Sequence, residues 1–461
     1  MERVAAQDAI FLAMEKPTWH QHTGGLIIYD TSDAPGFGFD TMRELIRERI
    51  PLAARFTCRV KEVPLGLDRP LWVEDRNFDV DNHMHRVALP APGGPHELGE
   101  LVGDLMGHQL DRRLPLWEMW YIEGLEGGHA AMLAKTHHSL MDGASGQGLA
   151  EHMFDLEPHP PAARVAPPAE RPDEPMPSDL ELMARGLLPT LRTPFAMSRY
   201  AVQLTQRGIA AVPFLRRADR PPTPMDAPPT PWNKRLSPRR ALSFVSVPLS
   251  ELKAIRLHHD VKINDVILAL VASAVRGYLI DVDALPDKPL VCGVPLSTRE
   301  EGDTELGNKI ANMFVALPVQ LDDPVARLRA IHASTVGAKE MTKAVRARSI
   351  QAIAEVAPPA LTNLAFRTMF SAELDRLLPA AANLLVSNMP GPPIPLYSGG
   401  ARLRAIYPLG PLMMGMGLNV TVMSYIDSVD FGVQCDPTLI PDPWAISDRI
   451  PEAVVELIKS T

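Results

Sequence analysis

The residues best suited to chemistry in this sequence are a histidine pair, His137 and His138, followed by Asp142 and Gly143. A neutral imidazole near pH 7 can remove a proton from a hydroxyl group, so one of these histidines can act as a general base. Residues 130–138 have the composition of a β-strand, on which successive side chains point to opposite faces. One histidine can therefore face an active site while the domain interior holds the other. An Asp-Gly pair favours a turn, which can bring Asp142 near the backbone that presents the ring.

Other uses of these residue types fit the segment less well. A second pair, His258-His259, lacks the spaced Asp-Gly and is interpreted as a solvated helix end. Because paired histidines can thus be purely structural, a structural role is also the alternative for the first pair. His137, His138 and Asp142 lack the regular spacing of metal ligands, and no nearby His or Cys completes a set. The residues from Gly143 to Gln147 break the serine-hydrolase pattern Gly-x-Ser-x-Gly at its last position. The sequence has neither a Gly-x-Gly-x-x-Gly segment nor a P-loop, so nothing points to a nucleotide-phosphate cradle.

The elements that must position these side chains are mixed in both halves of the chain. Residues 95–110 have the pattern of an amphipathic helix. Residues 264–279 are apolar nearly all round, which predicts a buried helix. Short apolar runs predict strands at residues 24–29, 290–295, 383–388 and 429–434. This mixture predicts α/β or α+β domains and leaves the order of the strands open.

Proline marks the boundary between the two halves. Seventeen of the 46 prolines fall between Pro158 and Pro231, a composition that builds neither helix nor central strand and is typical of a linker. At 461 residues the chain is also too long for one ordinary core, since single cores stop growing near about 250–300 residues. We therefore expect an N-terminal domain at residues 1–155, a linker at 156–237 and a C-terminal domain at 238–461.

The linker contains an arginine-rich segment. Seven arginines, no lysine and one acid lie between Ala184 and Arg220, and Arg185, Arg192 and Arg199 recur every seven residues among apolar side chains. One interpretation is an arm packed over the two domains. The other is a basic amphipathic segment that lies on an anionic membrane or lipid surface.

Charge and cysteine content limit the partners and the compartment. A net charge of −9 argues against a nucleic-acid partner, because no excess of cations can neutralise phosphates. Three scattered cysteines fit a reducing cytoplasm, and the N-terminus lacks the apolar region of a signal peptide. Residues 406–426 carry no charge over a length that could span a bilayer. Prolines and glycines interrupt the first half of this stretch, and residues 418–425 suit a strand, so a loop followed by a strand is predicted rather than a membrane helix.

The segment His-His-x-x-x-Asp-Gly resembles the active-site motif of the chloramphenicol acetyltransferase-like superfamily. Further segments, in order along the chain, resemble the wax ester synthase/diacylglycerol acyltransferase family within it. These segments are residues 7–12 and 22–25, Pro115-Leu116-Trp117, residues 122–125, Asn264-Asp265, residues 294–299, Gly307-Asn308, residues 387–391 and residues 417–425. The resemblance runs from about residue 5 to 460 and is weakest in the linker. One departure is Trp19-His-Gln-His22, where members commonly carry Met-His-Val-Gly.

The resemblance implies two chloramphenicol acetyltransferase-like domains with the active site at their interface. It implies that His138 is the general base, that His137 supports the geometry of the site, and that Asp142 is structural and pairs with an arginine. It further implies direct transfer from fatty acyl-CoA to the hydroxyl of diacylglycerol or a long-chain alcohol, with no metal and no prosthetic group. The enzyme is then expected to be cytoplasmic and able to associate with a membrane or lipid-droplet surface.

Other residues are candidates for substrate contact. Gly143 permits a tight path after the histidines, and Asn264 either caps its helix or lies near the substrate. Gly415 and Gly417 belong to an uncharged Gly- and Met-rich stretch that forms either a wall of the acceptor channel or a plain buried loop. Two other functions remain open: a condensation-type acyltransferase that uses carrier-protein-bound substrates, and a non-catalytic lipid-binding relative. Trp117 is expected in the core.

Overall fold

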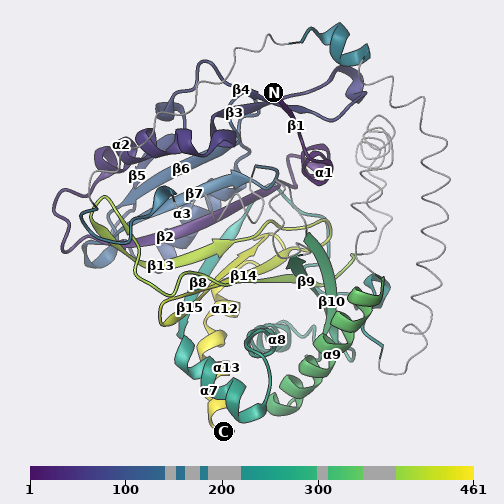
Figure 1. The fold of residues 1–461 in the computed structure, drawn as a ribbon. Coiled ribbons are helices and arrows are strands. Elements are labelled where there is room, and N and C mark those ends of the chain that lie inside the picture. Colours follow the sequence, from purple (N-terminus) through teal and green to yellow (C-terminus); the bar gives the residue numbers. More distant parts are fainter. Residues whose placement is uncertain (141–151, 161–176, 185–219, 298–309, 346–379, 461) are drawn as a thin grey trace.

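The computed structural model describes residues 1–140, 152–160, 177–184, 220–297, 310–345 and 380–460. Two six-stranded mixed sheets dominate the described part of the chain. Figure 1 shows them as successive layers, with helix α2 (Phe39–Arg49) on the outer side of one sheet. On the outer side of the other lie helices α7 (Leu249–His259), α8 (Ile263–Asp281), α9 (Pro324–Val345) and α13 (Arg449–Ile458). The predicted class, α/β with two domains, is confirmed.

The first sheet has the strand order β12-β13-β2-β7-β6-β5, and a small sheet, β1-β4-β3, lies beside it. The strands from the N-terminal half are β1 (Glu2–Arg3), β2 (His22–Asp30), β3 (Cys58–Lys61), β4 (Leu71–Glu74), β5 (Met84–Ala88), β6 (Trp117–Glu123) and β7 (Ala130–His137). The helices of this half are α1 (Ala6–Met14), α2 (Phe39–Arg49) and α3 (Pro95–Gly107). Residues 24–29 lie in a strand as predicted, the strand predicted at residues 130–138 ends one residue earlier, at His137, and α3 begins at the predicted proline.

Two strands of the first sheet come from the far end of the chain. Strands β12 (Tyr397–Ser398) and β13 (Ala401–Leu409) join it, and β13 pairs antiparallel with β2 from Arg402 opposite Asp30 to Leu409 opposite Gly24 (Figure 1). The boundaries read from proline content do not anticipate this exchange. The sheet that carries the histidine pair is therefore completed by residues on the other side of the linker.

The second sheet has the order β10-β9-β11-β14-β15-β8. Its strands are β8 (Ala241–Pro248), β9 (Leu290–Ser297), β10 (Ile310–Leu317), β11 (Leu384–Met389), β14 (Leu418–Tyr425) and β15 (Ser428–Cys435). Its helices are α7 (Leu249–His259), α8 (Ile263–Asp281), α9 (Pro324–Val345), α12 (Trp444–Ser447) and α13 (Arg449–Ile458). The strands predicted near residues 290, 383 and 429 are confirmed, and so is the solvated helix end at His258.

Helix α8 is the one described helix long and apolar enough to cross a membrane. Two thirds of its most apolar window is buried within the fold, and its side chains belong to the main core of the second domain. This confirms the predicted buried helix. The uncharged stretch at residues 406–426 contains the end of β13, a loop and strand β14, so the predicted strand at 418–425 is confirmed.

Close backbone approach joins the two halves along α3. A Cβ at Gly99 would lie 2.7 Å from the carbonyl oxygen of Leu242, and one at Gly103 would lie 2.8 Å from that of Arg240. Only glycine lets the helix lie so close to β8. The interface is also apolar, because Leu98 and Val102 of α3 share a buried cluster with Leu242.

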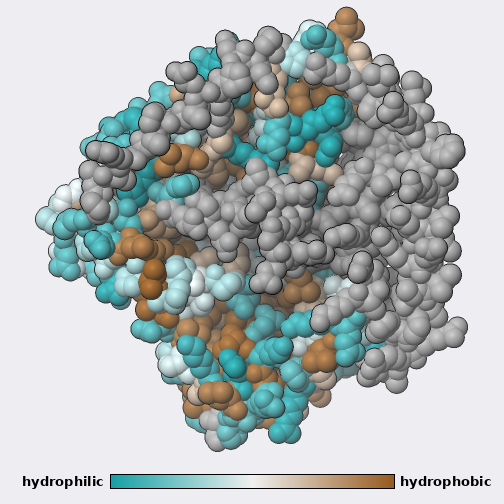
Figure 2. All heavy atoms as spheres, viewed as in Figure 1, coloured by the Kyte–Doolittle hydropathy of each residue, from teal (hydrophilic) through white to brown (hydrophobic). Residues whose placement is uncertain are grey.

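The last part of the proline-rich region packs with the second domain. Trp232 is fully buried in that domain's core, and its indole N–H donates to the carbonyl of Asn383 at 2.7 Å. On the face drawn in Figure 2, hydrophobic side chains form several separate groups among hydrophilic ones.

Candidate active site

The histidine pair lies where β7 ends against the start of β2. His137 is the last residue of β7 and pairs with His22, and the His138 N–H donates to the carbonyl of Gln21 at 2.7 Å. Alternation along β7 places His137 on the face covered by α3 and His138 on the face covered by α1. This arrangement matches the prediction that the two rings face opposite sides.

His137 is held as a neutral ring with a defined proton position. Its Nδ1 accepts a hydrogen bond from the backbone N–H of Ser139 at 3.1 Å and contacts the Ser139 Oγ at 2.7 Å. Because Nδ1 accepts, the ring carries its proton on Nε2. That nitrogen lies 3.8 Å from Glu15 Oε2. His137 thus fixes the turn that follows β7, which is the turn that presents His138.

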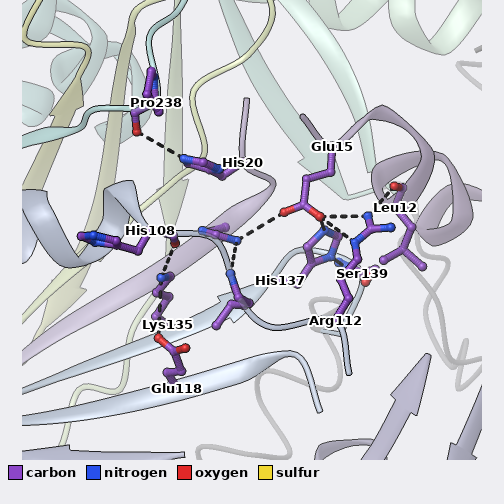
Figure 3. Close-up of polar contacts among 12 residues, drawn as sticks. Leu12, Glu15, His20, His108, Arg112, Glu118, Lys135, His137, Ser139 and Pro238 are labelled. Atoms are coloured by element: carbon purple, nitrogen blue, oxygen red, sulfur yellow. Dashed lines mark hydrogen bonds and ion pairs between the residues drawn. The ribbon is translucent and has the colours of Figure 1, made fainter. Parts of the chain in front are cut away.

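Glu15 is a buried carboxylate at the centre of this network (Figure 3). Its side chain is 4% exposed, and Arg112 Nε donates to its Oε2 at 2.9 Å. His22 Nε2 lies 3.4 Å from the other carboxylate oxygen. Arg112 also donates to the carbonyl of Leu12 at 2.6 Å, which ties it to α1. The carboxylate therefore links α1, β2 and β7 at one point.

A buried lysine fixes the neighbouring helix end. The Nζ of Lys135, on β7, donates to the carbonyl of Leu105 at 2.9 Å. It also donates to the carbonyl of His108 at 2.5 Å (Figure 3). The last carbonyls of a helix lack partners within it, so a cation at this position stabilises the end of α3.

His138 is covered by an aromatic side chain from α1. The ring of Phe11 stacks on the His138 ring with centroids 4.4 Å apart. Phe11 and Glu15 are four residues apart, a spacing that places side chains on one face of a helix. Phe11 on α1 therefore contacts His138, and Glu15 at the end of α1 lies close to His137. Phe11, Glu15 and Arg112 are not among the residues predicted from the sequence, although the four-residue spacing of Phe11 and Glu15 is a usable signal.

Burial keeps the histidines of this cluster neutral. It lowers the pKa of His138 and of His22, and it lowers the pKa of His20 to about 4 and that of His137 to about 3. Burial alone raises the pKa of Glu15, but its contacts with His22, His137 and Arg112 outweigh burial and bring the value to about 2. At pH 7 His138 is therefore an uncharged imidazole, the form that can accept a proton.

We expect the free energy of unfolding to fall as the pH is lowered from about 6.5 to about 4. The pKa values of His20 and His137 lie well below the ordinary value of an unfolded chain. The unfolded chain therefore binds more protons in this window, so the stability contributed by the neutral rings is complete above pH 6.5 and is lost on acidification. Urea unfolding midpoints at several pH values test this. His20→Asn should weaken the dependence and His258→Asn, at the solvated helix end, should not; midpoints that do not change with pH would contradict the prediction.

Three predicted site residues are placed as follows. Asp142 and Gly143 lie outside the described residues. Asn264 is the second residue of α8 and lines an open cleft with Arg256, Lys262 and His332. The N-cap of α8 is Lys262, so the interpretation of Asn264 as a helix cap is wrong. The neighbouring Asp265 has a structural role, since its carboxylate contacts His332 Nδ1 at 2.7 Å and accepts from Thr335.

Gly415 and Gly417 lie in the loop between β13 and β14. Gly415 has a φ of +70°, and its carbonyl accepts from the Asn233 side chain at 2.7 Å. A Cβ at Gly417 would lie 2.9 Å from the Trp232 carbonyl oxygen. These backbone requirements account for both glycines, and their contact with substrate stays a prediction. The loop contacts the segment that leads into β2, because the Trp19 indole N–H donates to the Leu412 carbonyl at 2.9 Å.

Comparison with protein families agrees with this geometry. A model of the wax ester synthase/diacylglycerol acyltransferase catalytic domain matches residues 4–267, and a model of the WS/DGAT C-terminal domain matches residues 306–458. The chain belongs to the wax ester synthase/diacylglycerol acyltransferase family. The family predicted from the motifs is thereby confirmed.

Individual relatives of this acyltransferase cover it almost end to end. A predicted diacylglycerol O-acyltransferase of Mycobacterium tuberculosis (strain CDC 1551 / Oshkosh) is 35% identical, with 100% of this chain and 90% of the relative covered. The solved wax ester synthase/diacylglycerol acyltransferase from Marinobacter aquaeolei VT8 is 26% identical, covers 99% of both chains and has a TM-score of 0.70. The first condensation domain of the calcium-dependent antibiotic synthetase has a TM-score of 0.55 at 15% identity, with 99% of this chain and 95% of that domain covered, so it shares the fold.

Proposed function

We propose that this O-acyltransferase moves a fatty acyl group from acyl-CoA to the hydroxyl of diacylglycerol, and also to that of a long-chain alcohol. Family membership over nearly the whole chain is the observation that carries the proposal. The geometry of the histidine pair supports the proposal. Burial lowers the pKa of His138, so its ring is neutral at pH 7, and its backbone N–H at the end of β7 is bonded to the Gln21 carbonyl.

The proposed mechanism is direct transfer without an acyl-enzyme. His138 takes the proton of the acceptor hydroxyl while the hydroxyl oxygen attacks the thioester carbonyl carbon. The carbonyl π electrons move onto oxygen and return as the carbon–sulfur bond breaks, and the CoA thiolate takes the proton from His138. Arg112 fixes the Glu15 carboxylate, which lies 3.8 Å from His137 Nε2, and His137 Nδ1 accepts from the Ser139 N–H in the turn that presents the base. Asp142 and Gly143 are proposed to shape the same turn.

The test offers labelled acyl-CoA with diacylglycerol and with hexadecanol in parallel. Apolar pockets discriminate by only about 1–3 kcal/mol per misplaced methylene, so we expect product from both acceptors, in different amounts. The absence of product from free acyl-CoA, together with activity on acyl groups bound to a carrier protein, would instead support a condensation-type enzyme.

We also propose that the arginine-rich segment binds an anionic lipid surface. Arg185, Arg192, Arg199 and Arg207 lie outside the described residues, so the proposal rests on their sequence pattern. Each cation near such a surface contributes about 1 kcal/mol. Changing all four to Gln should sharply reduce flotation with phosphatidylserine vesicles, and neutral phosphatidylcholine vesicles are the control. Unchanged flotation would favour an arm packed on the protein.

A further inference from the structure

Gln21 is a fully buried carboxamide beside the proposed base. Its side chain is 0% exposed, and neither its Nε2 nor its Oε1 has a hydrogen-bond partner among the described residues. Burying an unpartnered amide costs about 1–3 kcal/mol by protein mutational data, so such a group usually has a function or a partner from outside the chain.

The ladder between β2 and β7 places Gln21 on the same side of the sheet as His138. His22 pairs with His137, and the His138 N–H bond to the Gln21 carbonyl extends the ladder by one pair. Side chains directly opposite each other on antiparallel strands share a face, with Cβ atoms about 4.5–5.5 Å apart. Two pairs further along, the Thr23 and Thr136 hydroxyls show this sharing directly, since they hydrogen-bond to each other at 3.0 Å.

Other neighbours of His138 do not offer this chemistry. Phe11 covers the ring with an apolar face, while Glu15 and His22 lie on the α3 side with His137. Gln21 therefore brings both a hydrogen-bond donor and an acceptor to the face of the base, and unlike the Thr23 and Thr136 hydroxyls, which bond each other, its amide has no partner among the described residues.

We propose that Gln21 determines acceptor specificity by hydrogen-bonding a second oxygen function that lies next to the reacting hydroxyl. The inference rests on the proposed O-acyltransferase function and names the acceptor class that this site prefers. Diacylglycerol has an ester oxygen and carbonyl on the carbon beside its free hydroxymethyl group, whereas a simple alkanol has none. A site built around a buried polar group rejects an analogue that leaves this group unpaired. Gln21 thus favours glycerides over long-chain alcohols.

The test is Gln21→Met, which keeps the length of the side chain and removes the amide. We expect the ratio of kcat/KM for diacylglycerol to kcat/KM for hexadecanol to fall about tenfold, the upper range for one neutral hydrogen bond. The urea midpoint should stay the same or rise, because the amide has no partner within the described protein to lose. Gln21→Asn should restore part of the ratio. Gln320→Met, which alters a partly buried glutamine beyond β10, should leave the ratio unchanged.

Three results would overturn the inference. Equal losses with both acceptors would assign the amide to a step common to both reactions, such as stabilising the oxyanion. An unchanged ratio would remove Gln21 from acceptor recognition. A lower urea midpoint or failure to fold in both Gln21 variants would show that the amide serves the fold. Failure of the proposed function is distinguishable, because the unmodified enzyme would then esterify neither acceptor.

Discussion

Replacing His138 with alanine is expected to lower kcat by about 10²–10⁴-fold, the usual contribution of a general base. The reason is that His138 is neutral and is presented at a strand end fixed by its backbone bond to Gln21. Initial rates with acyl-CoA and diacylglycerol give the measurement, and the urea midpoint reports whether the variant remains folded. His258→Ala is the matched control, because His258 belongs to the second histidine pair and is exposed.

The two histidines of the first pair should respond differently. His137→Ala should lower both kcat and the urea midpoint, since its ring is buried and bonded to Ser139. His138→Ala should affect mainly kcat. Turnover close to that of the unmodified enzyme in a folded His138→Ala preparation would refute the mechanism.

Trp117→Ala is expected to lower the free energy of unfolding by about 3–5 kcal/mol, the range for removing a large aromatic side chain from a core. Trp117 is 0% exposed, its indole N–H donates to the Phe56 carbonyl at 2.8 Å, and its ring stacks on His83. The prediction that Trp117 belongs to the core is thus confirmed. Urea unfolding monitored by circular dichroism measures the effect.

A neighbouring tryptophan gives the control for this substitution. Trp120 lies on the same strand but on its opposite face, and it is only partly buried. Trp120→Ala should cost clearly less than Trp117→Ala. Equal costs, or a loss below about 1 kcal/mol for Trp117→Ala, would contradict the core assignment. The Trp117→Phe enzyme should have the same kcat/KM as the unmodified enzyme, because Trp117 is not part of the proposed site.

Local patterns predicted much of the fold because the physics that sets these elements is local. The composition of residues 418–425 suited a strand, and the structure has a strand with these bounds that is buried on both faces over most of its length. The apolar α8 was predicted within two residues at each end. Pro408, by contrast, lies inside β13, where the sequence suggested a loop. Residues 401–409 form a strand because they pair with β2, and this pairing with a distant segment cannot be predicted from the neighbouring sequence.

The sequence singled out the histidine pair, whose assignment to the active site stays a prediction, but it did not point to the residues that surround the pair. Two adjacent histidines on a strand must face opposite sides, so the opposite orientation of the two rings followed from geometry, whereas the roles given to His137 and His138 came from the family resemblance. The contact between Glu15 and His137 depends on where α1 meets β7, which is a tertiary event. Asn264 shows the reverse error: its residue type suits a helix cap, but the helix begins one residue earlier.

The exchange of β13 into the first sheet has a consequence for synthesis in the cell. Domains usually fold in turn as the chain leaves the ribosome. Here β2 keeps an open edge until residue 409 has been made, because its partner on that side is β13. An unpaired apolar strand edge invites association with other chains, and contacts between such distant residues form slowly. We therefore expect the open edge of β2 to be protected, by a chaperone or by later segments of the chain, until β13 has been translated.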